Sequence, residues 1–295
     1  MQPLLVGPES TKVGFIGTGI MGGPMAGHLL AAGYSLFVHN RTREKAEPLL
    51  LRGATWCDSV ASVAAASDVV VTIIGYPRDV EEVYLGGAGL VGNARPGTFL
   101  VDMTTSDPEL AVRIEREGRA RGLRCLDAPV TGGDVGAKKA ELSILVGGDE
   151  AEFRALVPIF ERLGNAVYQG PPGRGQHAKL ANQIAIAGTM LGVCEALAYA
   201  KRVGLDGERL IQSMSRGAAS SALLVNAGPR MLAGDFAPGF YVKHFIKDMD
   251  LALTQARGFG LDVPGLSLSR SRFAELEAKG HVNEGTQSLF RLYDR

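Results

Sequence analysis

The sequence predicts an α/β domain with a doubly wound, mainly parallel sheet, followed by an all-α domain that begins with a long helix. Up to about residue 172, short β-rich runs alternate with amphipathic stretches, which is typical of a parallel sheet with crossover helices. Beyond that point the alternation ends and helical stretches dominate. The length of 295 residues agrees, because it is about that of two typical domains.

The order of the elements follows from these patterns. We expect strands at 13–16, 35–39, 69–73, 99–101, 125–126 and 142–146. Between them we expect helices at 21–32, 43–51, 79–85 and 108–121, with Pro108 in a first turn, where proline is tolerated. In the second domain we expect helices at 179–203, 207–215, 220–232, 245–258 and 267–279.

The domain boundary is predicted from the densest turn signal in the chain, the glycine- and proline-rich run from Gly170 to Gly175. We therefore divide the chain into a tail at 1–10, an α/β domain at 11–172 and a helical domain at 173–295. The tail lacks the basic and apolar regions of a secretory signal.

Composition excludes several classes of protein. Hydrophobic residues make up 46% and charged residues 21%, unlike a disordered chain. Lys+Arg and Asp+Glu both number 31, so no net charge attracts nucleic acid or an anionic membrane surface. Cys57, Cys125 and Cys194 are widely spaced, which suggests reduced thiols and a cytoplasmic location. No cluster has metal-ligand spacing, so we expect no metal.

A glycine-rich turn directly follows the first predicted strand. It reads Gly17-Thr18-Gly19-Ile20-Met21-Gly22 and leads into a helical stretch, which is the context that a dinucleotide-binding fingerprint requires. Gly17 permits the tight turn, Gly19 lets the backbone approach a pyrophosphate, and Gly22 allows close packing of helix on strand. The pattern predicts a Rossmann domain; the alternative is a turn whose glycines serve packing alone.

The end of the second predicted strand indicates which dinucleotide binds. It reads Asn40-Arg41-Thr42-Arg43, at the place where an acidic residue would bind the ribose 2′-hydroxyl of NAD. A neutral amide, an arginine and a hydroxyl suit a 2′-phosphate instead. We therefore predict NADP(H) in preference to NAD(H). The alternative is that the arginines begin a solvated helix.

The first turns of the long helix carry the candidate catalytic group. Lys179 and Asn182 are three residues apart and Gln183 follows, so the three side chains emerge on one helix face. The stretch after them is mostly apolar, and a buried ammonium is costly unless it is used or paired. The alternative is a surface lysine on a fraying first turn.

A loop at the carboxyl edge of the sheet is the candidate substrate-binding segment. It begins at Asp127 and ends in Thr131-Gly132-Gly133. A hydroxyl followed by two glycines exposes backbone N–H groups, which suits a carboxylate at the edge where α/β sheets bind ligands. The alternative is a tight turn.

Together these segments resemble the β-hydroxyacid dehydrogenase family, which includes 3-hydroxyisobutyrate dehydrogenase, tartronate semialdehyde (2-hydroxy-3-oxopropionate) reductase and glyoxylate/succinic semialdehyde reductases. The resemblance spans residue 11 to the C-terminus. It rests on five ordered motifs: the glycine loop followed by Pro24-Met25-Ala26, the segment 102–105, the loop 127–133, the lysine segment 173–182 and the segment 247–252.

The resemblance implies a role for each matching residue. Lys179 would be the catalytic residue and Asn182 would help it hold the substrate. Thr131, Gly132 and Gly133 would bind the substrate carboxylate. Thr105 and Lys247 would line the cofactor, with Ile74 and Gly75 near its adenosine and ribose. Phe240 and Asp248 would lie near the pocket. Two residues depart from the family: many relatives have serine in place of Thr131 and a second asparagine in place of Gln183.

The function predicted is hydride transfer between NADPH and a small carboxylate-bearing aldehyde or keto acid, with Lys179 as general acid and base. The reverse reaction oxidises a β-hydroxy acid. An imine reductase of the same fold is one alternative, and a non-catalytic NADPH-binding protein is another, because fold alone does not prove chemistry. The broad apolar faces of the helical domain predict a homodimer or homotetramer. No nucleic acid or membrane partner is expected.

Overall fold

The structure is a computed structural model that describes residues 6–294. The chain divides into two compact units, Met1–Lys179 and Leu180–Arg295, each with its own core. Of the predicted tail, residues 1–5 lie outside the described part, and residues 8–10 form a turn before the first strand. The boundary predicted after Pro172 stays a prediction, and the two units are described separately below.

A nine-stranded sheet forms the centre of the first unit, in the order β3-β2-β1-β4-β5-β6-β8-β7, with β9 paired to β8. The six strands β1 to β6 are parallel, whereas β8 runs antiparallel to β6 and β7 and parallel to β9. The strands are β1 (Lys12–Ile16), β2 (Ser35–His39), β3 (Thr55–Trp56), β4 (Val69–Thr72), β5 (Phe99–Asp102), β6 (Arg124–Asp127), β7 (Val130–Thr131), β8 (Leu142–Gly147) and β9 (Gly164–Gly170).

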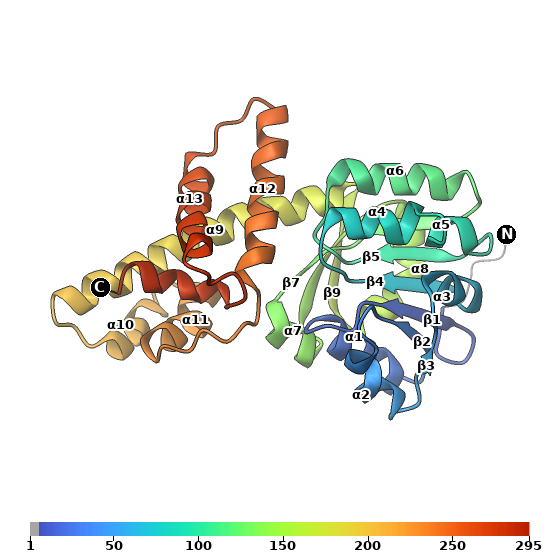
Figure 1. Cartoon of the computed structure of the whole chain (residues 1–295), viewed down its shortest axis with the longest axis horizontal. Coiled ribbons are helices and arrows are strands. Elements are labelled where there is room, and N and C mark those ends of the chain that lie inside the picture. Colours follow the sequence, from blue (N-terminus) through green and yellow to red (C-terminus); the bar gives the residue numbers. More distant parts are fainter. Residues whose placement is uncertain (1–5, 295) are drawn as a thin grey trace. The chain divides into compact units, whose positions relative to one another are not determined.

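Helices cover both faces of this sheet. The helices α4, α5 and α6 lie on one side, and α1 and α2 lie on the other (Figure 1). Side chains alternate between two cores: Val69 and Val71 pack with the α1 side, and Val70 with the α4 side. The helices are α1 (Gly22–Ala31), η1 (Arg43–Ala46), α2 (Glu47–Leu50), α3 (Val60–Ala66), α4 (Pro77–Leu85), α5 (Leu90–Asn93), α6 (Pro108–Arg119), α7 (Gly133–Lys139) and α8 (Glu150–Phe160).

The predicted fold class is confirmed, and the predicted strands are found within two residues of their expected ends. Sequence patterns missed β3 and β7 because each is only two residues long. They also missed β9 and the helices α3, α5, α7 and α8. At α6, Pro108 occupies the first turn as expected, and Asp107 caps the helix by accepting a hydrogen bond from the Glu109 N–H.

The second unit is helical. Its elements are the greater part of α9 (Arg174–Arg202), then α10 (Gly207–Met214), α11 (Ala222–Leu232), α12 (Val242–Gly258), α13 (Pro264–Ala278) and η2 (Thr286–Leu292). Its core contains Phe245 and Phe273, whose rings meet edge to face with centroids 5.1 Å apart. α9 begins at Arg174, earlier than the predicted start at residue 179. Hydrogen bonds from the start of this helix to Asp127 account for the difference.

Within the described residues, α9 is the one helix long and apolar enough, by length and composition, to cross a membrane, and 44% of its most apolar window is buried. The core helix of a soluble protein meets the same criterion, so α9 does not by itself indicate a membrane.

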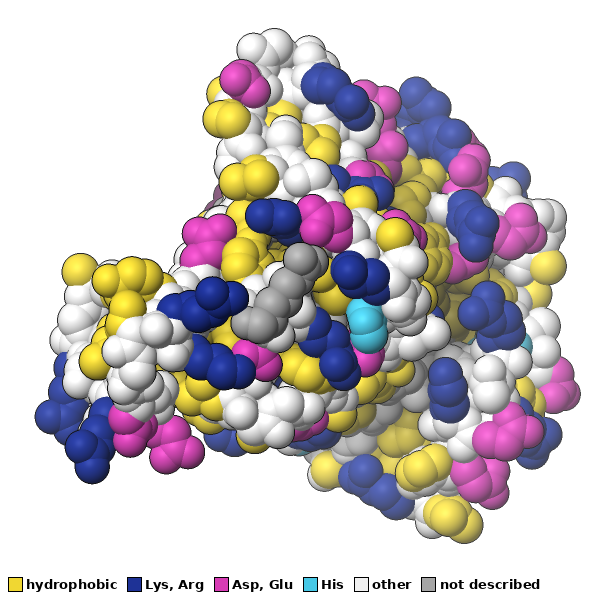
Figure 2. Space-filling model, turned by 60° about the vertical axis from the view of Figure 1, so that its left-hand side comes forward, with side chains coloured by type: hydrophobic (Ala, Val, Ile, Leu, Met, Phe, Trp, Pro, Cys, Tyr) yellow, Lys and Arg dark blue, Asp and Glu magenta, His cyan; other side chains and the backbone are white. Residues whose placement is uncertain are grey.

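Charged side chains of both signs are interspersed on the face drawn in Figure 2, in keeping with the equal numbers of acidic and basic residues. The second unit also exposes large apolar side chains. Among them are Tyr199, Val203, Leu205, Phe259 and Leu261. Self-association through such side chains stays a prediction.

Candidate active site

The glycine loop after β1 has two positions that packing reserves for glycine. Gly17 has a φ of +99°, and a Cβ on it would lie 2.1 Å from the Ile73 carbonyl oxygen. A Cβ on Gly22, the first residue of α1, would lie 1.8 Å from the Gly17 carbonyl oxygen. These glycines therefore allow the strand, turn and helix to pack closely, as the fingerprint predicts.

Gly19 differs from these two. A Cβ on Gly19 would have nothing within 4 Å, so packing within the chain does not require glycine there. The neighbouring Thr18 hydroxyl is buried and has no hydrogen-bond partner among residues 6–294. An open backbone beside an unsatisfied hydroxyl fits a phosphate group, whose oxygens accept hydrogen bonds. The alternative that the glycines serve packing alone does not explain Gly19.

The residues after β2 are hydrogen-bonded to this loop. The Thr18 N–H donates a 3.0 Å hydrogen bond to Asn40 Oδ1, and Asn40 Nδ2 donates to the Thr42 carbonyl at 2.7 Å. Arg41 and Thr42 are exposed, whereas the Arg43 guanidinium lies 5.1 Å from the centre of the Trp56 ring. Asn40 thus joins the glycine loop to the end of β2, and Arg43 stacks on a side chain of its own unit.

Polar groups link the carboxyl ends of β4 and β5. Asp102 Oδ1 accepts hydrogen bonds from the Thr72 hydroxyl and from the Thr104 N–H, and the Thr104 hydroxyl accepts one from the Ile74 N–H at 3.0 Å. These bonds fix the two loops that carry Ile74, Gly75 and Thr105. Thr105, predicted to line the cofactor, and Ile74 and Gly75, predicted near its adenosine and ribose, therefore follow adjacent strands of one sheet.

Asp127, at the end of β6, determines where α9 begins. Its two carboxylate oxygens accept 2.8 Å hydrogen bonds from the backbone N–H groups of Gly173 and Gln176. Because the first N–H groups of a helix have no partner within the helix, this carboxylate lets α9 start at Arg174. Burial raises the pKa of the Asp127 carboxyl to about 7, against the lowering effect of the two N–H donors.

Gln176 ties the same helix turn to the loop after β5. Its side-chain Oε1 accepts from the Ser106 N–H, and its Nε2 donates to the Thr104 carbonyl, both at 2.8 Å. Lys179 lies three residues further along α9 and is 6% exposed. The lysine is therefore a buried residue on a helix whose start is fixed to the sheet, rather than a surface residue on a fraying turn.

The predicted carboxylate loop has the backbone geometry that glycine permits. Gly132 and Gly133 have φ values of +127° and +62°, and both are exposed. Thr131 is half-buried and pairs with Ser143 on β8. The loop thus presents a backbone without side chains next to a hydroxyl.

The polar residues predicted in the second unit are linked by one chain of contacts. Asn182 Nδ2 donates a 2.9 Å hydrogen bond to Gln183 Oε1, and Gln183 Nε2 donates a 2.6 Å bond to Asp248 Oδ2. The Lys247 ammonium lies 2.8 Å from Asp248 Oδ1. Gln183 and Asp248 are each 1% exposed, and Asn182 is half-buried. Phe240 packs on Phe245, with ring centroids 5.7 Å apart.

Sequence reasoning did not anticipate the roles of Asp127, Gln176 and Gln183. Asp127 and Gln176 lie 49 positions apart in sequence, and Gln183 and Asp248 lie 65 apart. No local pattern reveals a bond of that separation. The signal available in the sequence was an amide or carboxylate side chain within a few positions of a predicted site residue.

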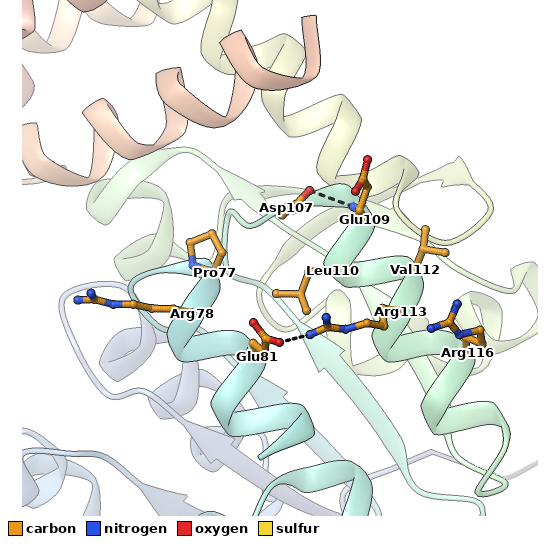
Figure 3. A pocket seen from close by; sticks show the side chains of 9 residues that line it. All are labelled: Pro77, Arg78, Glu81, Asp107, Glu109, Leu110, Val112, Arg113 and Arg116. Atoms are coloured by element: carbon orange, nitrogen blue, oxygen red, sulfur yellow. Dashed lines mark hydrogen bonds and ion pairs between the residues drawn. The ribbon is translucent and has the colours of Figure 1, made fainter. Parts of the chain in front are cut away.

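A cavity of about 430 Å³ lies elsewhere on the first unit, between α4 and α6 (Figure 3). Side chains of both charges line it, and an ion pair between Arg113 and Glu81 crosses it. Its lining residues are Pro77, Arg78, Glu81, Asp107, Glu109, Leu110, Val112, Arg113 and Arg116. None of the predicted site residues is among them, so we do not assign it to the candidate site.

Two known sequence families match the two parts of the chain. The sequence model described as the NAD binding domain of 6-phosphogluconate dehydrogenase matches residues 12–170. The model described as NAD-binding of NADP-dependent 3-hydroxyisobutyrate dehydrogenase matches residues 173–293. The 2-hydroxy-3-oxopropionate reductase of Escherichia coli is 40% identical, over 91% of this chain and 92% of its own. The chain belongs to the β-hydroxyacid dehydrogenase family.

Two further relatives are more similar in sequence. An uncharacterized oxidoreductase of Bacillus subtilis, YkwC, is 51% identical over 95% of this chain and 98% of its own. A probable 3-hydroxyisobutyrate dehydrogenase-like protein of Arabidopsis thaliana, described as mitochondrial, is 47% identical over 99% of this chain and 87% of its own.

Several solved structures share the fold of this chain. Mycobacterium tuberculosis 3-hydroxyisobutyrate dehydrogenase with L-serine has a TM-score of 0.85 and 27% identity, covering 97% of this chain and 99% of its own. Psf3 in complex with NADP+ and 2-OPP has a TM-score of 0.89 and 26% identity, covering 95% and 99%. An imine reductase from Pseudomonas sp. has a TM-score of 0.64 and 20% identity, covering 95% and 98%, which shows the fold alone.

Proposed function

We propose that this chain is an NADP-dependent oxidoreductase that interconverts a small β-hydroxy acid and its semialdehyde. The observation that carries the proposal is Lys179, a buried lysine on a helix whose first turn is bonded to the dinucleotide-binding sheet through Asp127 and Gln176. A buried ammonium at a fixed position is suited to proton transfer. Membership of an NAD(P)-dependent hydroxyacid dehydrogenase family supports the reaction class.

The cofactor would be held by the first unit. The backbone of the run 17–22 would bind the pyrophosphate, with the Thr18 hydroxyl as a further donor. Asn40, Arg41 and Thr42 would surround the ribose 2′-phosphate, because none is acidic and Arg41 is exposed. Ile74, Gly75 and Thr105 lie on the adjacent loops, and Lys247 of the second unit completes the predicted set. When bound, NADPH supplies the hydride and NADP+ accepts it.

The substrate would be held through its carboxylate and its reacting oxygen. The Thr131 hydroxyl and the exposed backbone of Gly132 and Gly133 would bind the carboxylate. Lys179 would donate a proton to the oxygen of the aldehyde during reduction and remove it from the hydroxyl during oxidation. Asn182 would bind the substrate one helical turn away, and Phe240 and Asp248 would lie near it.

The substrate range includes the acids named for the relatives. One relative is named for 2-hydroxy-3-oxopropionate, another for 3-hydroxyisobutyrate, and a solved structure contains L-serine. All three are short acids that carry oxygen at the third carbon. We place glyoxylate and succinic semialdehyde in the same range. We also propose a cytoplasmic homo-oligomer, supported by three buried free cysteines and by the exposed apolar side chains of the second unit.

The test follows NADPH and, separately, NADH at 340 nm with glyoxylate, succinic semialdehyde, tartronate semialdehyde and methylmalonate semialdehyde. Cyclic imines serve as the control substrates. Turnover of at least one acid, faster with NADPH, is expected. Turnover of imines alone would favour an imine reductase instead. Tight NADPH binding without any turnover would favour a non-catalytic NADPH-binding protein.

A further inference from the structure

Asn182, Gln183 and Asp248 form a chain of hydrogen bonds. Their donor and acceptor groups allow one orientation of the Gln183 amide and one of the Asn182 amide. An ionised carboxylate accepts hydrogen bonds and cannot donate them. Gln183 must therefore turn its NH₂ group toward Asp248 Oδ2, at the observed 2.6 Å. This leaves Gln183 Oε1 facing Asn182, at 2.9 Å from Nδ2.

Asn182 is oriented in turn. Because the atom that faces it is a carbonyl oxygen, Asn182 must present its NH₂ group to Gln183. Its own carbonyl oxygen, Oδ1, is then directed away from Gln183. A flip of the Asn182 amide would place two carbonyl oxygens in contact. The half-buried end of this chain of bonds is therefore an acceptor whose direction is fixed.

The carboxylate at the far end is held in place by charge. Asp248 is 1% exposed, and the Lys247 ammonium lies 2.8 Å from its Oδ1. Buried charges persist in proteins when they are paired in this way. Oδ2 accepts a hydrogen bond from Gln183, whereas Oδ1 has the ion-pair contact to Lys247 and no hydrogen-bond partner among residues 6–294.

We propose that Gln183 and Asp248 are positioning residues that fix the Asn182 carbonyl oxygen as a hydrogen-bond acceptor, so that the site selects substrates with a donor next to the reacting carbon. This inference rests on the proposed function, in which Lys179 acts on the reacting oxygen. Residues three apart on a helix have Cβ atoms about 5–6 Å from each other. Asn182 therefore reaches atoms one or two bonds from that oxygen. The substrate carboxylate accepts hydrogen bonds only and the reacting hydroxyl donates to Lys179, so the donor of the substrate that is left for Asn182 Oδ1 is a hydroxyl or ammonium on the second carbon.

Four acids with one skeleton test this selection: 3-hydroxypropionate and its derivatives with a hydroxyl (glycerate), an ammonium (serine) or a methyl group (3-hydroxyisobutyrate) on the second carbon. Oxidation of each is measured with NADP+, and kcat and KM are determined separately. We expect kcat/KM for glycerate or serine to exceed that for 3-hydroxyisobutyrate and 3-hydroxypropionate by about tenfold or more, since an acceptor left without a donor is costly.

Two variants test the chain of bonds. Gln183→Met keeps the length of the side chain but neither donates nor accepts the two bonds, so Asn182 is released. We expect the preference for donor-bearing acids to fall by about tenfold or more, mainly through KM. Gln183→Glu places two carboxylates in contact and should also lower kcat/KM.

The rescue combines Gln183→Glu with Asp248→Asn. An asparagine at 248 can keep its oxygen toward Lys247 and turn its NH₂ group toward the new carboxylate, which then accepts from Asn182 as Gln183 does now. The net charge is unchanged and the direction of Asn182 is kept. We expect the double variant to recover most of the preference that Gln183→Glu alone loses, although Asp248 itself has changed.

A matched control removes a buried bond elsewhere on the same helix. The Ser269 hydroxyl donates a 3.3 Å hydrogen bond to the Ala187 carbonyl of α9, so Ser269→Ala tests general disturbance of this core. Circular dichroism and the Kd for NADPH verify that each variant is folded.

The outcomes separate the two proposals. Equal loss of kcat/KM for all four acids in Gln183→Met, or a wild-type preference for the methyl-bearing acid, would overturn the inference and leave the proposed function standing. Neither turnover nor binding of any acid would contradict both.

Discussion

Replacing Asp127 with asparagine changes how the stability of the protein depends on pH. Burial raises the pKa of this carboxyl from 3.8 to about 7. The folded state therefore binds the proton more tightly than the unfolded state between these two values. The Asp127 contribution to stability is fully present below about pH 4 and is lost as the pH rises through 7.

The magnitude follows from the size of the shift. About 3 pKa units at roughly 1.4 kcal/mol each correspond to about 4 kcal/mol over this interval. Asp127→Asn removes the titrating group, so the difference in the free energy of unfolding between wild type and variant should fall by about 1.4 kcal/mol per pH unit between pH 4.5 and 6.5. It should level off above pH 7. The variant also loses one of the two bonds to Gly173 and Gln176, which offsets the whole curve by about 1–3 kcal/mol without changing its slope.

The assay is urea unfolding of both proteins at intervals of one pH unit from 4.5 to 8.5. Asp206→Asn is the matched control, because Asp206 also accepts two backbone N–H groups at a helix start but is exposed. A difference that rises with pH would refute the reasoning. It would mean that the two N–H donors outweigh burial and hold the carboxyl ionised.

Three further predictions concern the proposed chemistry. Lys179→Ala should lower kcat by about 10² to 10⁴ while the Kd for NADPH changes little, as measured by stopped-flow turnover and by fluorescence titration; unchanged turnover would remove Lys179 from the mechanism. Gly19→Ala should fold with nearly wild-type stability yet bind NADPH weakly, whereas Gly22→Ala should lower the melting temperature because its Cβ would lie 1.8 Å from a carbonyl oxygen; equal stability of the two variants would contradict this. Arg41→Ala should raise the Kd for NADPH about tenfold and leave that for NADH nearly unchanged, as titration of both cofactors would show; a parallel change in both would argue against a 2′-phosphate contact.

Much of the fold could be predicted because its signals are local. The strand at 13–16 and the glycine turn after it lie within ten residues, and the contact that requires glycine at Gly22 is with Gly17 in the same turn. The contact at Gly17 is with Ile73, after β4, but the spacing of the glycines already indicated the turn. The two-residue strands β3 and β7 carry no such signal, since two residues show no period.

The helix face that carries the candidate site residues could be predicted from the sequence, but the contacts that hold this helix in place could not. Helical spacing places Lys179 and Asn182 on one face of α9, and that spacing is visible in the sequence. What holds α9 is a carboxylate at the end of β6 and an amide bonded to the loop after β5. Such bonds depend on which strands become neighbours in the sheet, so they emerge only once the sheet is assembled.

The cap on α9 decides where the chain can be cut for expression of a fragment. A fragment that ends at Pro172, after the last strand, contains every strand of the sheet but lacks both N–H groups that satisfy Asp127. Its β6 would then end in a buried carboxylate without donors, and the loop after β5 would lose the Gln176 amide. A fragment extended through Lys179 keeps these bonds. We therefore expect a stable fragment of the first unit to include the first turns of the helix that follows the sheet.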